Sequence, residues 1–299
     1  MDPSGREWPL AGGTHPGSAP IASSVTRFPL PVDVEPAPVF PWGDVENPLP
    51  ERLSILLPAL NEEMGVEAVL KRIPRSALKK QGLAYSVYLL DGRSTDQTRS
   101  VASHFGAEVF VQTGSGKGSA FREFVPRITD AMTVLLDSDG TYPPESIPQL
   151  VGALGRESPV VLGSRLRGSI NEGAMSTANY LGNRLLSWFA SFLFETPISD
   201  VCSGMWAFRS DRLKSLGLTA NGFELEADIF AECALLGIPI AEVPIRYDKR
   251  IGEPKLRLRE GVKIALALLK KRLRASPRRR EKPSVEAGSR SLGPTEGSG

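Results

Sequence analysis

Short apolar runs alternate with helical stretches through the first part of the chain. Each run has the length and composition of a strand buried on both faces, and most of the runs end in Pro, Gly or an acidic residue. Strands that alternate with helices in this way predict an α/β domain with a mostly parallel sheet and helices on both faces. The runs are Leu53–Pro58, Tyr85–Asp91, Val109–Val111, Met132–Leu136 and Pro159–Gly163.

The pattern changes in the second half, where two helical segments carry unusual apolar surfaces. Asn179–Glu195 has more apolar residues than one core-facing stripe requires, so it is either a central packed helix or one that lies in a membrane interface or covers an apolar substrate. Residues 258–274 place leucines on one face and Lys and Arg largely on the other. Such a basic amphipathic helix either rests on an anionic membrane surface or is a solvated terminal helix. A last strand is predicted over Ile238–Tyr247.

The two ends of the chain differ from its middle. Residues 1–50 contain too many prolines for regular structure, so they predict an extended leader. Residues 275–299 predict a disordered basic and polar tail. The chain of 299 residues, 41% of them hydrophobic, can bury one substantial core. We therefore predict a single catalytic domain over residues 51–257, followed by the amphipathic helix.

Composition excludes several classes of function. A net charge of +2 gives no bulk electrostatic case for nucleic acid binding. Two cysteines and two histidines make a disulfide framework, a zinc site or a His-based triad improbable. The sequence has neither the apolar core of a signal peptide nor 18 consecutive apolar residues. We expect a cytoplasmic protein, peripheral at most at the membrane face, and the oligomeric state stays open.

Two carboxylates follow the fourth predicted strand. Asp137 and Asp139 lie two positions apart, so both side chains emerge on one side of the strand's carboxyl end if the chain stays extended. Open α/β sheets bind ligands at that edge, and paired like charges there favour a cation. A solvated Asp-Ser-Asp-Gly turn is the structural alternative.

Other candidate residues occupy equivalent positions on neighbouring strands. Asn61 is a good helix N-cap with Glu62 in the first turn, although the stretch Pro58–Glu62 could instead line a ligand pocket. Asp91 ends its strand as Asp137 ends its own. Lys117 lies between glycines, where backbone amides and one cation could bind an anion, unless the segment is a plain turn.

Taken together, these segments resemble family 2 glycosyltransferases of the GT-A fold. The resemblance rests on Pro58–Glu62, Asp91–Asp96, Gly116–Gly118 and Asp137–Asp139, in that order and spacing. The second half is similar to the dolichyl-phosphate and polyprenyl-phosphate mannosyltransferase branch. The motifs there are Gly163–Arg165, Asn179–Asn183, Asp200–Gly204, Gly222–Glu226, Glu242–Arg246 and Gly252–Leu256.

The resemblance implies a role for each matching residue. Asp137 and Asp139 would bind the Mg²⁺ or Mn²⁺ that bridges the donor diphosphate, and Asp91 would accept hydrogen bonds from the base. Asp200 would be a positioning group or a weak base. The remaining donor-site residues would be Pro58, Asn61, Glu62, Lys117 and Ser138, and the phosphate-binding residues would be Arg165, Arg246 and Lys255.

These roles predict an inverting, metal-dependent transfer of a hexose from a nucleotide sugar, such as GDP-mannose or a UDP-hexose. The acceptor implied by the resemblance is a polyprenyl or dolichyl phosphate. One alternative keeps the donor chemistry but uses a soluble small-molecule acceptor. Another is a non-catalytic nucleotide-sugar-binding or membrane-adaptor protein.

Overall fold

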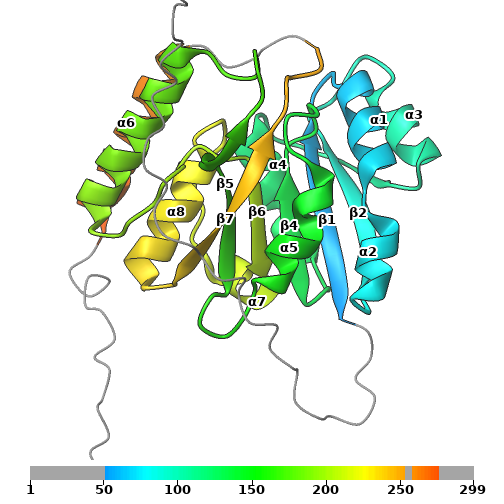
Figure 1. Ribbon diagram of the computed structural model, residues 1–299, viewed down its shortest axis with the longest axis horizontal. Helices are drawn as coiled ribbons and strands as arrows, with labels where there is room; N and C mark the ends of the chain where they lie inside the picture. Colours follow the sequence, from blue (N-terminus) through cyan, green and yellow to red (C-terminus); the bar gives the residue numbers. More distant parts are fainter. Residues whose placement is uncertain (1–50, 253–257, 276–299) are drawn as a thin grey trace, which may run out of the picture. The chain divides into compact units, whose positions relative to one another are not determined.

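A computed structural model describes residues 51–252 and 258–275, and a seven-stranded sheet forms its centre (Figure 1). The strand order is β3-β2-β1-β4-β6-β5-β7. Strand β6 is antiparallel to both of its neighbours, and every other pairing is parallel, which confirms the predicted mostly parallel sheet. The strands are β1 (Arg52–Ala59), β2 (Ala84–Asp91), β3 (Glu108–Val111), β4 (Met132–Leu136), β5 (Val160–Ile170), β6 (Met205–Arg209) and β7 (Ile240–Tyr247).

Helices cover both faces of the sheet. They are α1 (Glu63–Arg72), α2 (Arg75–Lys80), α3 (Thr98–His104), α4 (Lys117–Phe124), α5 (Ile147–Gly152), α6 (Thr177–Phe194), α7 (Ser210–Ser215), α8 (Leu225–Leu236) and α9 (Leu258–Arg274). Short 3-10 turns span Val125–Arg127 and Pro144–Ser146. Helix α9 occupies the range over which the sequence predicts an amphipathic helix.

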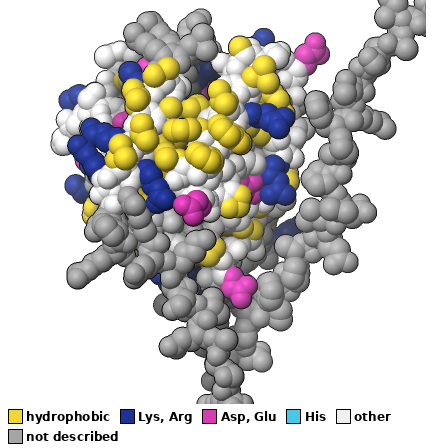
Figure 2. All heavy atoms as spheres, turned by 90° about the vertical axis from the view of Figure 1, so that its left-hand side faces the viewer, with side chains coloured by type: hydrophobic (Ala, Val, Ile, Leu, Met, Phe, Trp, Pro, Cys, Tyr) yellow, Lys and Arg dark blue, Asp and Glu magenta, His cyan; other side chains and the backbone are white. Residues whose placement is uncertain are grey.

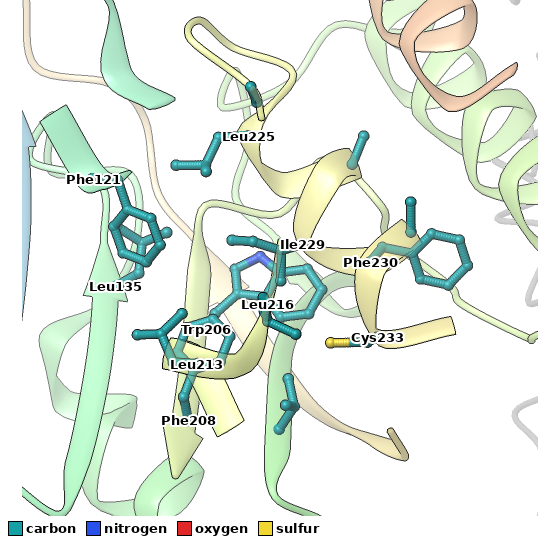
Figure 3. Close-up of a cluster of buried hydrophobic side chains, with 14 of the residues drawn as sticks. Phe121, Leu135, Trp206, Phe208, Leu213, Leu216, Leu225, Ile229, Phe230 and Cys233 are labelled. Carbon is teal, nitrogen blue, oxygen red and sulfur yellow. The ribbon is translucent and has the colours of Figure 1, made fainter. Parts of the chain in front are cut away.

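The sheet separates two hydrophobic clusters. Leu53, Ile55 and Leu57 of β1 pack with α1, α2, α3 and α5, whereas Leu56 between them packs with α4, α7 and α8. This alternation follows from the strand period of two residues. Trp206 of β6 lies fully buried in the second cluster, together with side chains of α4 and α8 (Figure 3). The strands are therefore fixed rigidly from both sides, and the loops at their ends are held by a packed core.

One expectation about helices is wrong, and one of the two alternatives for Asn179–Glu195 is excluded. Asn61 does not cap α1, whose N-cap residue is Glu62, because Asn61 adopts a left-handed conformation and bonds to the neighbouring loop instead. Helix α6 is not a central packed helix, since only Ser187, Ala190 and Phe194 of its residues are buried. Its remaining apolar side chains lie partly or largely at the surface.

Several predicted features lie outside the described residues. They are the leader over residues 1–50, Lys255, and the tail beyond Ala275. Within the part of the chain that is described, no helix has both the length and the apolar character needed to cross a bilayer.

Candidate functional site

Asp137 and Asp139 lie at the carboxyl edge of the sheet, directly after β4. The Asp137 backbone N–H donates to the carbonyl of Gly204 over 3.2 Å, which ties this turn to the segment before β6. Asp139 accepts hydrogen bonds from the Thr141 backbone N–H at 3.0 Å and from the Thr141 hydroxyl at 2.5 Å. The Asp137 backbone and the Asp139 carboxylate are thus held by fixed partners, and the turn is not a freely solvated one.

Lys117 connects the first aspartate to a second carboxylate. Its ammonium lies between Asp137 and Glu226 and donates to both. Lys117 begins α4 and Glu226 lies in the first turn of α8, so two helices from opposite halves of the sequence meet at Asp137. Burial raises the pKa of Asp137 to about 6; Lys117 opposes the shift, and the carboxylates of Glu226 and Asp139 add to it.

Arg250 makes the matching connection to the second aspartate. Its guanidinium donates to Asp139 and also to Glu62, at the start of α1. The segment that carries it is fixed on the aspartate turn, because the Ile251 N–H donates to the Asp139 carbonyl over 3.0 Å and the Asp248 N–H donates to the Thr141 carbonyl over 2.8 Å. Arg250 therefore reaches the acidic pair through a loop that follows β7.

Acidic and basic side chains meet at this edge. Four carboxylates, Asp137, Asp139, Glu62 and Glu226, contact two cations, Lys117 and Arg250. Among the described residues, no group of three His, Cys, Asp or Glu side chains could hold a metal ion by itself. Magnesium binds through one or two carboxylates together with water and substrate phosphates, so the two aspartates fit a divalent ion bound with a diphosphate.

The ends of β1 and β2 are joined beside this cluster. Asn61 accepts a hydrogen bond from the Thr95 backbone N–H at 2.8 Å, and its own N–H donates to the Ser94 hydroxyl at 2.9 Å. The fully buried Asp91 accepts hydrogen bonds from the backbone N–H groups of Arg93 and Ser94 at 3.0–3.3 Å. The predicted base acceptor Asp91 thus organises the turn after β2.

The ends of β1 and β4 are joined as well. Ser138 donates its hydroxyl proton to the Pro58 carbonyl over 2.7 Å. A Cβ added at Gly65 would overlap the Ser138 carbonyl oxygen and lie 3.0 Å from the Asp139 Cα, and a Cβ at Gly204 would overlap the Asp137 carboxylate. Glycine is required at these two positions because the backbone there lies against the acidic turn.

Arg165 and Asp200 form a buried ion pair. The guanidinium donates to both Asp200 oxygens at 2.8 and 2.7 Å, and the Arg165 backbone N–H adds a third hydrogen bond at 3.0 Å. Arg165 is 6% exposed and Asp200 is 0% exposed, and the guanidinium lies over the rings of Tyr142 and Tyr247. The predicted phosphate-binding arginine and the predicted positioning acid are partners of one another.

Arg246 lies apart from that pair. Its side chain is half exposed and forms a two-pronged ion pair with Asp248, with distances of 2.7 and 3.1 Å. Asp248 also contacts Arg72 of α1 at 3.2 Å. Of the predicted phosphate-binding residues that the structure describes, Arg246 is therefore the accessible one.

Sequence reasoning did not assign Glu226 or Arg250 to the site. Glu226 ends the motif Gly222–Glu226 and Arg250 follows the predicted last strand, but the sequence pattern gave neither residue a role of its own. Their contacts with Lys117 and Asp139 span 109 and 111 positions of sequence, a separation over which local patterns give no information.

The fold and this edge define a class of protein. Open α/β sheets bind ligands at the carboxyl ends of their strands, and the acidic pair with its two cations lies at that edge. The sequence profile of glycosyl transferase family 2 matches residues 54–217, and the chain belongs to that family. Its fold is GT-A-like.

Individual relatives agree with this assignment. The chain is 36% identical over 204 residues to the glycosyltransferase AglJ of Haloferax volcanii. The matched region covers 68% of this chain but only 65% of the relative. It is 35% identical to the dolichyl-phosphate hexose transferase of the same organism, covering 68% of this chain and 86% of the relative. The fold also matches a crystal structure of glucosyl-3-phosphoglycerate synthase from Mycobacterium tuberculosis with Mn²⁺ and uridine-diphosphate-glucose. The two superimpose with a TM-score of 0.57 at 26% identity, over 74% of this chain and 79% of that one.

Proposed function

We propose that the protein transfers a hexose from a nucleoside diphosphate sugar to a polyprenyl phosphate at a membrane face, with Mg²⁺ or Mn²⁺ bound by Asp137 and Asp139. The observation that carries this proposal is the acidic pair of Asp137 and Asp139 at the carboxyl edge of the sheet, with Lys117 and Arg250 in contact with it. Two carboxylates together with a diphosphate are the ligands that such a divalent ion takes. The neighbouring structure with Mn²⁺ and uridine-diphosphate-glucose supports the donor class.

The residues around the acidic pair suit the charge that develops during transfer. Cleavage at the anomeric carbon leaves negative charge on the departing nucleoside diphosphate, and a bound divalent ion would offset it as a Lewis acid. Lys117 and Arg250 lie beside the same carboxylates and can contact a diphosphate bound there. Cations fixed before the reaction stabilise developing charge without reorganising. The two residues would therefore orient the donor and stabilise the leaving group.

A lipid phosphate acceptor requires no strong base, and among the residues that the structure describes no histidine belongs to the cluster around the acidic pair. The acceptor oxygen is already anionic and can attack the anomeric carbon directly, which inverts that centre. Arg246, half exposed at the end of β7, would hold the acceptor phosphate. The carboxylate of Asp200 is fully buried and engaged by Arg165, so we assign it no proton transfer; it would position Arg165. The printed name of the dolichyl-phosphate hexose transferase relative supports this acceptor class.

The substitution Asp137→Asn tests the metal and donor site. We expect Mn²⁺ with UDP- or GDP-sugars to raise the melting temperature of the unmodified protein, and this rise to disappear in the variant, because one metal ligand has lost its charge. Transfer of radiolabelled hexose should fall at least 100-fold. Asp211→Asn is the matched control, since that carboxylate is exposed and lies outside the site. Full metal-dependent transfer by Asp137→Asn would remove the proposed site.

A soluble acceptor is the second candidate, favoured by the structural likeness to a protein named glucosyl-3-phosphoglycerate synthase. Incubation with labelled nucleotide sugars and either polyprenyl phosphate or small phosphorylated acids separates the two. Label in the organic phase supports the lipid acceptor, and label that stays with a water-soluble product supports the alternative. An intact metal-dependent thermal shift without any turnover or donor hydrolysis would instead indicate a non-catalytic binding protein.

A further inference from the structure

Helices α6 and α9 each carry a row of large apolar side chains that face solvent. On α6 the row is Leu181, Leu185, Trp188 and Phe192, which are 60–71% exposed. On α9 it is Val262, Leu266, Leu269 and Leu273, which are 39–72% exposed. Both rows repeat at positions i, i+4, i+7 and i+11, which is one continuous stripe along an α-helix. We refer to these eight side chains as the apolar face.

These stripes are not the faces by which the helices pack on the domain. Helix α6 buries Ser187, Ala190 and Phe194, and α9 buries Ile264 and Leu268, on the sides opposite their exposed rows. The need for core packing therefore explains the inner faces only. Leucine, tryptophan and phenylalanine on the outer faces require another explanation, because contiguous exposed apolar patches mark binding surfaces.

The two stripes form one surface. A Cβ added at Gly261 would lie 3.7 Å from Leu186, and Arg272 contacts Glu195 at 3.3 Å, so α6 and α9 run side by side in the same direction. Figure 2 shows the resulting cluster of hydrophobic side chains over these helices. Trp188 and Phe192 stack on one another at a ring distance of 5.8 Å within it. The surface is wider than either helix could provide alone.

Basic side chains border the apolar face. Arg184, Lys263, Lys270 and Arg274 are exposed on the two helices, and Figure 2 shows dark blue side chains on both margins of the cluster. The exposed acid Glu195, which follows the last residue of α6, is paired with Arg272. An apolar centre with a cationic border complements a surface that is apolar inside and anionic at its boundary.

We propose that the apolar face is the surface by which this protein docks on an anionic lipid bilayer, with the eight apolar side chains inserted among the acyl chains and the four cations against the headgroups. The proposal deepens the proposed function, because it names the surface at which a polyprenyl phosphate would be met. Tryptophan favours the headgroup level of a bilayer, and Lys and Arg are attracted to anionic lipids. A second copy of the chain fits less well, since a two-fold contact through this face would bring its cationic borders together.

The docking surface is joined rigidly to the site. Lys271 of α9 is held by Asp228 and by Glu232 at 2.8 Å, both on α8. Glu226, in the first turn of that same helix, binds Lys117 beside the acidic pair. Helix α6 also begins soon after β5, which ends at the carboxyl edge of the sheet. Docking through this face would therefore set the orientation of the site relative to the bilayer.

Vesicle co-sedimentation of the full chain tests the proposal without any substrate. We expect binding to vesicles of phosphatidylcholine with phosphatidylglycerol, and weaker binding to phosphatidylcholine alone or at high salt. The double variant Leu185→Glu with Leu266→Glu should bind at least tenfold more weakly, because charges replace the inserted side chains. Leu236→Glu, on α8 and outside the face, is the matched control and should bind as the unmodified protein does.

The proposal is overturned if the unmodified chain stays in the supernatant with anionic vesicles, or if the double variant binds them equally well. Dimers in sedimentation equilibrium that the double variant loses, without any vesicle binding, would assign the face to a second copy instead. The Mn²⁺-dependent thermal shift with nucleotide sugars must persist in the double variant. Failure of that shift in the unmodified protein would concern the proposed function and leave the docking result intact.

Discussion

Replacing Asp200 by Asn tests whether the buried ion pair with Arg165 is structural. The substitution keeps the size of the side chain but removes the charge that faces a guanidinium only 6% exposed to solvent. Breaking a buried pair from one side costs about 3–5 kcal/mol, because the remaining charge cannot be hydrated. An Asn amide oxygen in place of the Asp200 oxygen that accepts from the Arg165 backbone N–H and Nε keeps two of the three hydrogen bonds, so we expect a loss at the lower end, about 3 kcal/mol.

Urea unfolding followed by circular dichroism measures this loss. With a denaturant dependence of about 2 kcal/mol per molar urea, a loss of about 3 kcal/mol lowers the unfolding midpoint by about 1.5 M. Adding Arg165→Met to Asp200→Asn should recover part of the loss, because the unpaired charge is then removed as well. The exposed carboxylate of Asp211 is the matched control, and its replacement by Asn should change stability by less than about 0.5 kcal/mol.

One result would refute this reasoning. If Asp200→Asn unfolds at the same urea concentration as the unmodified protein but has lost hexose transfer, the carboxylate acts on the substrate and the pair with Arg165 opens during turnover. A loss of both stability and transfer in Asp200→Asn, with stability but not transfer recovered in the double variant, would support the positioning role, because the double variant lacks the arginine that Asp200 positions.

Two further predictions concern the loops around the acidic pair. Hydrogen bonds lower the pKa of Glu123 to about 2, and the largest contribution comes from the Thr113 backbone N–H. The ionised carboxylate therefore stabilises the fold above its unfolded pKa near 4.5, and this stabilisation is lost as the pH falls toward 2. Glu123→Gln should therefore lower the free energy of unfolding by about 1 kcal/mol at pH 7, a modest value because solvent screens this carboxylate. The difference in urea midpoint between the variant and the unmodified protein should vanish near pH 2. A difference that does not depend on pH would contradict this reasoning. Gly65→Ala should weaken Mn²⁺-dependent nucleotide binding at least tenfold in thermal-shift titrations, because the added Cβ would overlap the Ser138 carbonyl oxygen. Gly155→Ala is the control and should bind nucleotide normally, since a Cβ there meets nothing within 4 Å. Equal affinities of the two variants would show that the acidic turn can shift freely.

The sequence by itself determined the sheet and the position of the acidic pair. Buried strands are short apolar runs, and whatever follows them lies at the sheet edge, so Asp137 and Asp139 could be placed from local pattern alone. The same reasoning placed Asp91 at the end of β2. It also found the helical segments that became α6 and α9, since helical periodicity is a local property.

The tertiary structure decided which of these residues meet. Arg165 could be predicted to lie near phosphates, but its partner Asp200 is 35 positions away, and only the packing of β5 against the segment before β6 joins them. Arg250 reaches Asp139 because the loop after β7 folds back over the acidic turn. Asn61 lost its expected capping role because the neighbouring β2 loop offered it better partners.

The orientation of α6 was the largest difference. Its composition indicates a helix that is apolar on most sides, and a pattern of that kind does not reveal which side will face the core. Small residues such as Ser187 and Ala190 point inward because α6 lies close against the domain, which leaves Trp188 and Phe192 outside. Local periodicity fixes which side chains share a face, whereas the partner of each face depends on segments far away in the sequence, and only the folded chain brings those segments together.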